Sequence, residues 1–170
     1  MKIYIAADHA GFHLKKQLIQ YLQVKDFEVE DCGAYELDEA DDYPDFIIPC
    51  AQKVALRQAQ GHDDLGIVIG GSGQAEAICA NKVRGVRAVV FYGPILPHGA
   101  ADVTGRISRD AYEMVKLTRM HNNANVLSLG ARFLTGDEAK KAVSAFLENK
   151  FEGGRHVRRV DKITKYEETK

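Results

Sequence analysis

The chain has 170 residues, of which 45% are hydrophobic, and its formal net charge at pH 7 is −1. This length and composition predict one globular domain with a core of useful size, and the balanced charge gives no indication of a nucleic-acid or acidic partner. No apolar run approaches the roughly 18 residues of a membrane span, and the first residues lead into a strand rather than a signal peptide, so we expect a cytoplasmic protein. Three widely separated cysteines with no C-x-x-C spacing indicate neither a disulfide framework nor a zinc site.

Strands and helices alternate along the first half of the chain. We predict four strands, at residues 3–7, 27–32, 65–69 and 87–92. Helical spacing of apolar residues predicts three helices between them, at residues 12–22, 44–60 and from the glycine turn at 70–73 to about residues 84–85. An acidic segment at residues 36–42 is expected to be a solvated loop.

The alternation is interrupted after the fourth strand. Residues 93–110 contain two prolines and three glycines with little periodicity, which is long for a connection inside a compact α/β domain. We therefore expect an insertion at about residues 95–109, within a single domain that spans residues 1–170. Periodicity then predicts a helix at residues 111–120, a fifth strand at 125–129, a helix from the Thr135 cap to about residue 147, and a last helical segment in the tail.

The alternation predicts a parallel sheet covered on both faces, with a binding site at the carboxyl ends of its strands. The strongest signal for a site is Gly70-Gly71-Ser72-Gly73, which joins a buried strand to a helix. Backbone N–H groups at such a turn bind an oxyanion or phosphate. A Walker loop is absent, and the dinucleotide fingerprint fails because its third glycine falls on Glu76. A turn that requires glycine only for structural reasons remains the alternative.

Other polar residues fall near the ends of the same strands. Asp8 and His9 follow the first strand, His121 precedes the fifth and Arg132 follows it. Each has a simpler explanation, since Asp8 can cap a helix, His9 can be an ordinary loop histidine and Arg132 can be a surface charge. Taken together, an anion-binding turn, cations, and two acid/base candidates in His121 and Glu76 fit a phosphorylated substrate.

Several short motifs follow one another through nearly the whole chain: Asp8-His9-Ala10-Gly11, Asp42-Tyr43-Pro44-Asp45, Gly70-Gly71-Ser72-Gly73-x-x-Glu76, His121-Asn122-Asn123-x-Asn125, Gly130-x-Arg132 and Gly153-Gly154-Arg155-His156-x-x-Arg159. Together they resemble the family of type B ribose-5-phosphate isomerases, which includes the galactose-6-phosphate isomerase subunits. The resemblance implies a Rossmann-like three-layer α/β/α fold with a five-stranded parallel sheet and a C-terminal helical extension. It implies a homodimer or a dimer of dimers whose active sites are built from two subunits. It also implies aldose–ketose isomerisation of a sugar phosphate through an enediol, without metal or nucleotide cofactor.

The resemblance further implies a role for each matching residue. One branch of the family uses a cysteine at the end of the third strand as the base, whereas this chain has Gly70 there and resembles the other branch, in which Glu76 moves the proton between C1 and C2. The enediolate oxygen would be stabilised by Ser72 and by the N–H groups of Gly71, Gly73, Gln74 and Ala75. His121 would open the furanose ring with help from Asp8. The phosphate pocket would be formed by His9, Arg132, Arg155, His156 and Arg159. A substrate hydroxyl would be contacted by Asn122.

The sequence is also consistent with other functions. The chain can be an isomerase of another four- to six-carbon sugar phosphate, one subunit of a heteromeric isomerase, or a non-catalytic sugar-phosphate sensor. A sensor can dispense with proton-transfer residues, so the presence of both Glu76 and His121 favours an enzyme. The insertion brings His98, Arg106 and Arg109, which fit either a longer or more acidic substrate or a surface or subunit-contact loop. His13, four residues after His9, suggests a metal site, but no third ligand is evident.

Overall fold

The computed structural model, which describes residues 1–169, contains one five-stranded sheet whose strands all pair in parallel. The strand order is β2-β1-β3-β5-β4. The strands are β1 (Lys2–Ala7), β2 (Glu28–Asp31), β3 (Leu65–Gly70), β4 (Ala88–Phe91) and β5 (Val126–Gly130). All five lie where the sequence predicts them, and the α/β class is confirmed.

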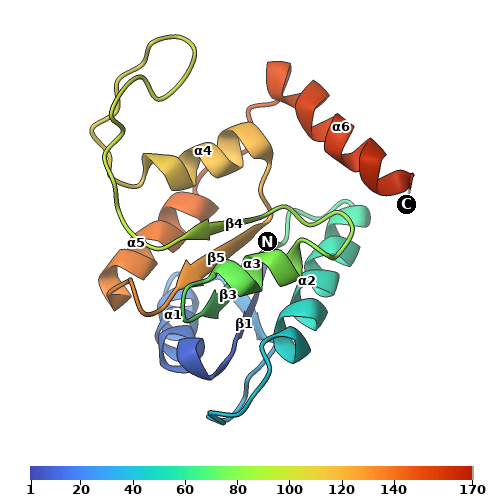
Figure 1. The fold of residues 1–170 in the computed structure, drawn as a ribbon, viewed down its shortest axis with the longest axis vertical. Coiled ribbons are helices and arrows are strands. Elements are labelled where there is room, and N and C mark those ends of the chain that lie inside the picture. Colours follow the sequence, from blue (N-terminus) through green and yellow to red (C-terminus); the bar gives the residue numbers. More distant parts are fainter. Residues whose placement is uncertain (170) are drawn as a thin grey trace.

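Helices cover both faces of the sheet, as Figure 1 shows. The α-helices are α1 (Phe12–Val24), α2 (Pro44–Ala59), α3 (Gln74–Ala80), α4 (Glu113–Asn122), α5 (Gly136–Leu147) and α6 (Val157–Glu168), and the short 3-10 helices are η1 (His9–Gly11) and η2 (Gly154–His156). One core packs α1, α4 and α5 on one face, and a second core packs α2 and α3 on the other. Successive strand residues feed alternate cores, because Cβ atoms alternate along a strand: Ile3 and Ile5 belong to the first, Tyr4 and Ala6 to the second. This is the three-layer α/β/α arrangement.

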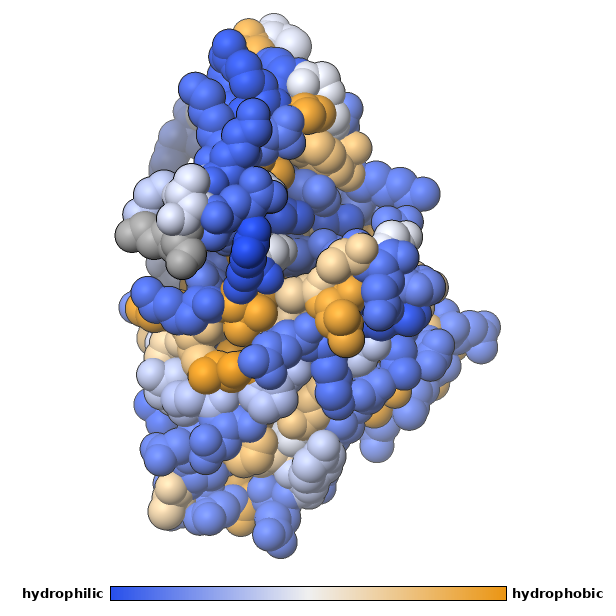
Figure 2. Space-filling view, turned by 90° about the vertical axis from the view of Figure 1, so that its right-hand side faces the viewer, coloured by the Kyte–Doolittle hydropathy of each residue, from blue (hydrophilic) through white to orange (hydrophobic). Residues whose placement is uncertain are grey.

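The C-terminal extension lies apart from these layers. Helix α6 has no buried residue, and Figure 1 shows it projecting from the body of the molecule. Figure 2 views the molecule from that side, where hydrophobic residues gather in patches within a mostly hydrophilic surface. Three large apolar side chains of α6 are exposed, those of Val157, Ile163 and Tyr166. Within residues 1–169, no helix combines the length and the apolar composition that crossing a membrane requires.

The predicted boundaries of two helices are wrong. The helix after β3 ends at Ala80 rather than near residues 84–85, because the Asn81 side chain bonds both the N–H and the carbonyl of Ala88 and so ties the chain to the start of β4. The helix expected at residues 111–120 runs instead from Glu113 to Asn122. Its start is delayed because the Asp110 carboxylate holds the N–H of Tyr112 in a turn.

The segment expected to be an insertion is folded. Ala100 and Ile107 form an isolated antiparallel bridge, and the N–H of Ala101 donates to the carbonyl of Arg106 at 2.7 Å. The turn between them is closed by Asp102, whose carboxylate accepts from the N–H and hydroxyl of Thr104 at 2.9 and 2.6 Å. In Figure 1 this loop projects from the body beside the start of α4.

Candidate active site

Glu76 lies at the carboxyl end of β3, directly over Gly70. A Cβ atom added to Gly70 would stand 2.0 Å from Oε1 of Glu76, so the carboxylate occupies the space that any side chain at position 70 would need. Glu76 reaches this place because it sits in the first turn of α3, which begins immediately after the glycine turn. The carboxylate of Glu76 can therefore lie at this position only because residue 70 has no side chain.

The environment of Glu76 suits a base. Its side chain is buried, with 3% of the residue exposed, and Oε2 has no hydrogen-bond partner among the described residues. Burial is the largest influence and raises the pKa of Glu76 above its ordinary value of 4.5. Its backbone N–H opposes this shift in pKa, and the nearby Asp8 charge adds to it. A buried carboxylate with a free oxygen and a raised pKa is prepared to accept a proton.

The glycine turn is held tightly against the end of β5. Gly73 has φ of 75°, and a Cβ there would lie 2.9 Å from the backbone carbonyl carbon of Leu129. The Ser128 hydroxyl donates to the carbonyl of Gly73 at 2.5 Å. The Ser72 side chain accepts from the N–H of Gln74 at 3.3 Å. This packing fixes the turn residues Gly71, Ser72, Gly73, Gln74 and Ala75 beside the carboxylate of Glu76.

Two cationic side chains lie beside this turn. The guanidinium of Arg132 lies over Gly71, where an added Cβ would be 3.1 Å from Cζ of Arg132. The backbone N–H of Arg132 donates to the carbonyl of Gly71 at 3.0 Å. His9 follows β1 and is close enough to Arg132 and Asp8 for both charges to act on its pKa. Asp8 is buried, and its carboxylate accepts from the N–H of Gly11 at 3.1 Å. This hydrogen bond confirms the capping role of Asp8. Its part in ring opening stays a prediction.

Asp41 is a residue that the sequence analysis missed. The acidic loop was expected to be solvated, but the Asp41 side chain is only 6% exposed and accepts from His9 Nδ1 at 2.6 Å and from the His9 N–H at 3.1 Å. This hydrogen bond is the main reason why the pKa of His9 is raised above 6.5. The only signal in the sequence is that Asp41 directly precedes the Asp42-Tyr43-Pro44-Asp45 motif. We call Asp8, His9, Asp41, Ser72, Glu76 and Arg132 the carboxyl-edge cluster.

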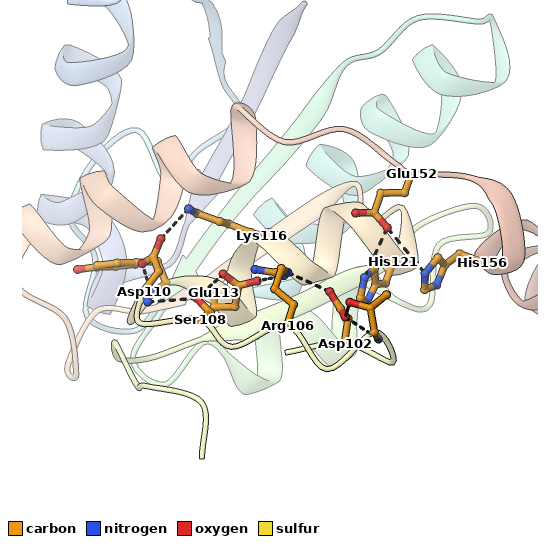
Figure 3. A network of polar contacts seen from close by, with 11 residues as sticks. Asp102, Arg106, Ser108, Asp110, Glu113, Lys116, His121, Glu152 and His156 are labelled. Carbon is orange, nitrogen blue, oxygen red and sulfur yellow. Dashed lines mark hydrogen bonds and ion pairs between the residues drawn. The ribbon is translucent and has the colours of Figure 1, made fainter. Parts of the chain in front are cut away.

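The remaining predicted residues form a second group. His121 at the end of α4 stacks on His156 with ring centroids 4.2 Å apart and an 11° angle between the planes. Oε2 of Glu152 lies 3.6 Å from Nε2 of His121 and 4.0 Å from Nε2 of His156. Figure 3 shows the Glu152 carboxylate facing both rings. Burial and then the neighbouring His121 lower the pKa of His156. Together with the adjacent Asn122, Arg155 and Arg159, these residues make up what we call the amino-edge cluster.

The two clusters lie at opposite ends of the sheet. Arg119 and Asn123, from the end of α4, line a cavity of about 500 Å³ with Met1 and Leu65, which stand at the amino ends of β1 and β3. Glu76 and Arg132 instead follow the carboxyl ends of β3 and β5. A five-residue strand at about 3.3 Å per residue separates these edges by roughly 15 Å. Within one chain, His121 therefore lies at the other edge of the sheet from Glu76 and Arg132, because α4 runs antiparallel to the strand that follows it. The role of His121 in an active site stays a prediction.

Two groups in residues 1–169 have enough His and carboxylate atoms in proximity to suggest a metal: Asp8, His9 and Asp41, and His121, Glu152 and His156. In the first, His9 and Asp41 already satisfy one another by a hydrogen bond. In the second, the rings are stacked almost parallel, so their in-plane lone pairs do not converge on one ion as a tetrahedral site requires. Neither group contains His13, whose ring instead meets the edge of Phe12.

Comparisons with known proteins agree on one family. A sequence model of the family described as Ribose/Galactose Isomerase matches residues 3–100 and 108–163. A probable ribose-5-phosphate isomerase B of Mycoplasma genitalium is 42% identical over 165 residues, which cover 97% of this chain and 95% of that protein. The ribose-5-phosphate isomerase B of Mycolicibacterium paratuberculosis is 38% identical over 170 residues, covering 99% of this chain and 93% of the relative.

Solved structures give the same result. The crystal structure of ribose-5-phosphate isomerase B from Mycoplasma genitalium with bound ribulose-5-phosphate matches with a TM-score of 0.83 and 40% identity, covering 99% of this chain and 97% of that one. The enzyme of Clostridium thermocellum matches with a TM-score of 0.81 and 36% identity, covering 99% of both chains. The family match skips residues 101–107, which fall inside the segment expected to be an insertion.

Proposed function

The chain belongs to the ribose/galactose isomerase family, and we propose that it interconverts ribose 5-phosphate and ribulose 5-phosphate. The observation that carries the proposal is the Glu76 carboxylate, which is buried over Gly70 beside a glycine turn and two cations, with one oxygen that accepts no hydrogen bond from residues 1–169. That combination joins a base to an anion-binding pocket, as isomerisation of a sugar phosphate requires. We assign the activity to a single domain of residues 1–170 with an insertion at about 95–109, acting in the cytoplasm without cofactor.

The proton transfer is assigned to Glu76. In the open-chain aldose, Glu76 removes the proton from C2 and the C1 oxygen takes up the negative charge, which gives an enediolate. The C2 hydroxyl proton moves to the C1 oxygen, so that the charge passes to the oxygen at C2. Return of the proton from Glu76 to C1 then gives the ketose. Ser72 and the turn N–H groups of Gly71, Gly73, Gln74 and Ala75 stabilise the negative oxygen of the intermediate. His9 and Arg132 bind the phosphate, for which the planar guanidinium of arginine offers two parallel hydrogen bonds.

The ring-opening step needs the other cluster. His121 is assigned the proton transfer that opens the furanose ring, a general acid–base role for which histidine is the most common side chain. Asp8 assists from the edge where the substrate lies. Asn122 contacts a sugar hydroxyl, and Arg155, His156 and Arg159 complete the phosphate pocket. Because these residues lie at the far edge of the same sheet, we propose that they serve the site of a second copy in a homodimer, alone or within a dimer of dimers.

The test is proton NMR in D2O with ribose 5-phosphate and the purified chain. We expect ketose to form with deuterium entering at C2 of the aldose, and Glu76→Gln to remove both signals. Glu76→Asp is the matched control, because it retains a carboxylate that is one methylene shorter and should keep a reduced but measurable exchange. Near-normal turnover by Glu76→Gln would disprove the assignment of the base.

The same experiment separates the alternatives. Exchange only with a four- or six-carbon sugar phosphate would retain the mechanism and change the substrate. Binding of sugar phosphates without exchange would favour a sensor or a missing partner subunit, and full activity of the single purified chain would exclude an obligatory partner.

A further inference from the structure

Helix α4 carries His121 and Asn122 at its last turn, yet little apolar packing fixes it to the body. Three of its side chains are buried, and two of these, Glu113 and Arg119, are charged. Only Val115 is a buried apolar side chain. An element with few buried apolar contacts depends on its polar anchors to hold one position.

The anchors at the two ends of α4 come from different parts of the chain. At the last turn, Arg119 bonds the carbonyl of Ala124 and the side chain of Asn123, and the N–H of Glu152 donates to the carbonyl of Met120 at 3.0 Å. At the first turn, the helix has no side-chain cap from Tyr112. Lys116 pairs there with Asp110 at 2.6 Å. The other side-chain contacts of the first turn come from the insertion.

Those contacts converge on Glu113, which begins α4 and is 4% exposed. Arg106 pairs with its Oε1, and the Ser108 hydroxyl donates to its Oε2 at 2.8 Å. Arg106 also holds Asp102 at 2.9 Å, which ties the pair to the turn of the insertion. Figure 3 shows this network at one end of α4 and the stacked histidines at the other.

The insertion also extends along α4 as far as the site residues. Its residues Ile95, Leu96 and His98 enclose a cavity of about 440 Å³ with Met114, Leu117 and Asn122. One wall of the space next to Asn122 is therefore made by the insertion.

From these contacts we propose that Arg106 is a positioning residue: through Glu113 it fixes α4, and thereby sets His121 for ring opening. This inference deepens the proposed function and rests on it for the role of His121. The physical reason is that loss of Arg106 leaves a buried carboxylate without its cation. The first turn of α4 must then shift until Glu113 finds water, and the rigid helix transmits the shift to its last turn.

Two activities distinguish positioning of His121 from general damage. Consumption of ribose 5-phosphate begins with ring opening, whereas ribulose 5-phosphate has its C5 hydroxyl esterified and stays open. Exchange of the C1 hydrogen of ribulose 5-phosphate with D2O therefore needs the Glu76 base but no ring opening. We expect Arg106→Ala to slow aldose consumption by about tenfold to a hundredfold, the effect of a small misplacement of a catalytic group, and to change the ketose exchange by less than about twofold.

Controls and a structural readout complete the experiment. Arg106→Lys should recover part of the aldose rate, since it restores one positive charge to Glu113. Arg109→Ala removes the same charge from an exposed residue of the insertion for which no ion pair occurs among the described residues, and should leave both rates unchanged. The imidazole NMR signals of His121, identified by their absence in His121→Asn, should shift in Arg106→Ala and not in Arg109→Ala.

Several outcomes would overturn the inference: an equal loss of both activities, no loss of either, the same loss in Arg109→Ala, or unmoved His121 signals. Absence of both activities in the unmodified chain would instead refute the proposed function, and the NMR signals would still decide whether Arg106 positions His121.

Discussion

At the scale of single residues, the site depends on Gly70 and Glu76, because the carboxylate of Glu76 fills the space beside the bare Cα of Gly70. The sequence predicts Glu76 in the first turn of a helix, but it does not reveal that the carboxylate is buried over Gly70. The turn that carries Glu76 packs against β5, and the charge of Asp8, which is 68 residues away in the chain, adds to the rise in the pKa of Glu76. Periodicity reports on one segment at a time, so it cannot show an environment made by three strands.

The first prediction concerns Gly70. Gly70→Ala should lower kcat by about a hundredfold, equivalent to about 2.7 kcal/mol of activation free energy, because the new methyl group displaces the Glu76 carboxylate. The fold should survive, since the displaced atoms are the end of a flexible side chain. Gly93→Ala is the control, because an added Cβ there has no atom within 4 Å. Kinetics and thermal unfolding check the result, and a kcat within twofold of the unmodified chain would contradict it.

The second prediction follows from the raised pKa of Glu76. As a base it must be ionised, so the acid limb of kcat/KM should have its midpoint above 4.5, the ordinary pKa of a glutamate. The same shift affects stability. The folded state binds the Glu76 proton more tightly than the unfolded state does, so its contribution is most favourable at low pH and declines as pH rises from 4.5 through the raised pKa.

Glu76→Gln removes that titration. The difference in unfolding free energy between the unmodified chain and Glu76→Gln should therefore fall over this pH range and become constant above it. Denaturant titrations at several pH values measure it, and a difference that is independent of pH would mean that burial does not perturb this carboxylate.

At the scale of elements, the periodic segments could be predicted and the connections could not. All five strands are found at their predicted places. The three central strands, β1, β3 and β5, give the clearest signal, because buried parallel strands are apolar on both faces. The end of α3 and the start of α4 were missed because side-chain bonds from Asn81 and Asp110 determine them. The insertion was expected from its length and composition, but its attachment through Arg106 and Glu113 depends on a folded hairpin that no local pattern indicates.

The third prediction belongs to the acidic loop between β2 and α2. Asp41 raises the pKa of His9, so His9 keeps its positive charge to a higher pH than an isolated imidazole of pKa 6.5. Asp41→Asn should lower that pKa toward 6.5 and weaken phosphate binding where His9 has become neutral. We expect KM for ribose 5-phosphate to rise in the variant at pH values above 6.5, and to approach that of the unmodified chain at lower pH, where both are protonated.

The control for that experiment is Asp42→Asn, which changes the next residue, an exposed one, and should leave KM unaltered at every pH. An increase in KM that is the same at all pH values would indicate that Asp41 acts by shaping the loop rather than through the charge of His9.

At the scale of the whole molecule, twofold symmetry between two copies of the chain can bring the two separated clusters together. The twofold dimer proposed above would place the amino-edge cluster of each copy against the carboxyl-edge cluster of the other and so make two equivalent sites. The motifs themselves could be read from the sequence. Their distribution over opposite edges of the sheet could not, because it follows from the direction in which α4 crosses back to the start of β5.

The last prediction tests this arrangement by mixing two inactive variants. Glu76→Gln lacks the base and His121→Asn lacks the ring-opening group, so each alone should be inactive toward ribose 5-phosphate. If a site takes Glu76 from one copy and His121 from the other, a mixed dimer contains one site with both residues intact and one with neither. Equal mixing with free exchange makes half of the dimers mixed, so activity should recover to about a quarter of that of the unmodified protein. Glu76→Gln carried alone through the same mixing step, at the same final protein concentration, controls for dilution. If both residues instead served the same chain's site, no mixture of these variants could contain an intact site and the activity would stay at the level of the separate variants.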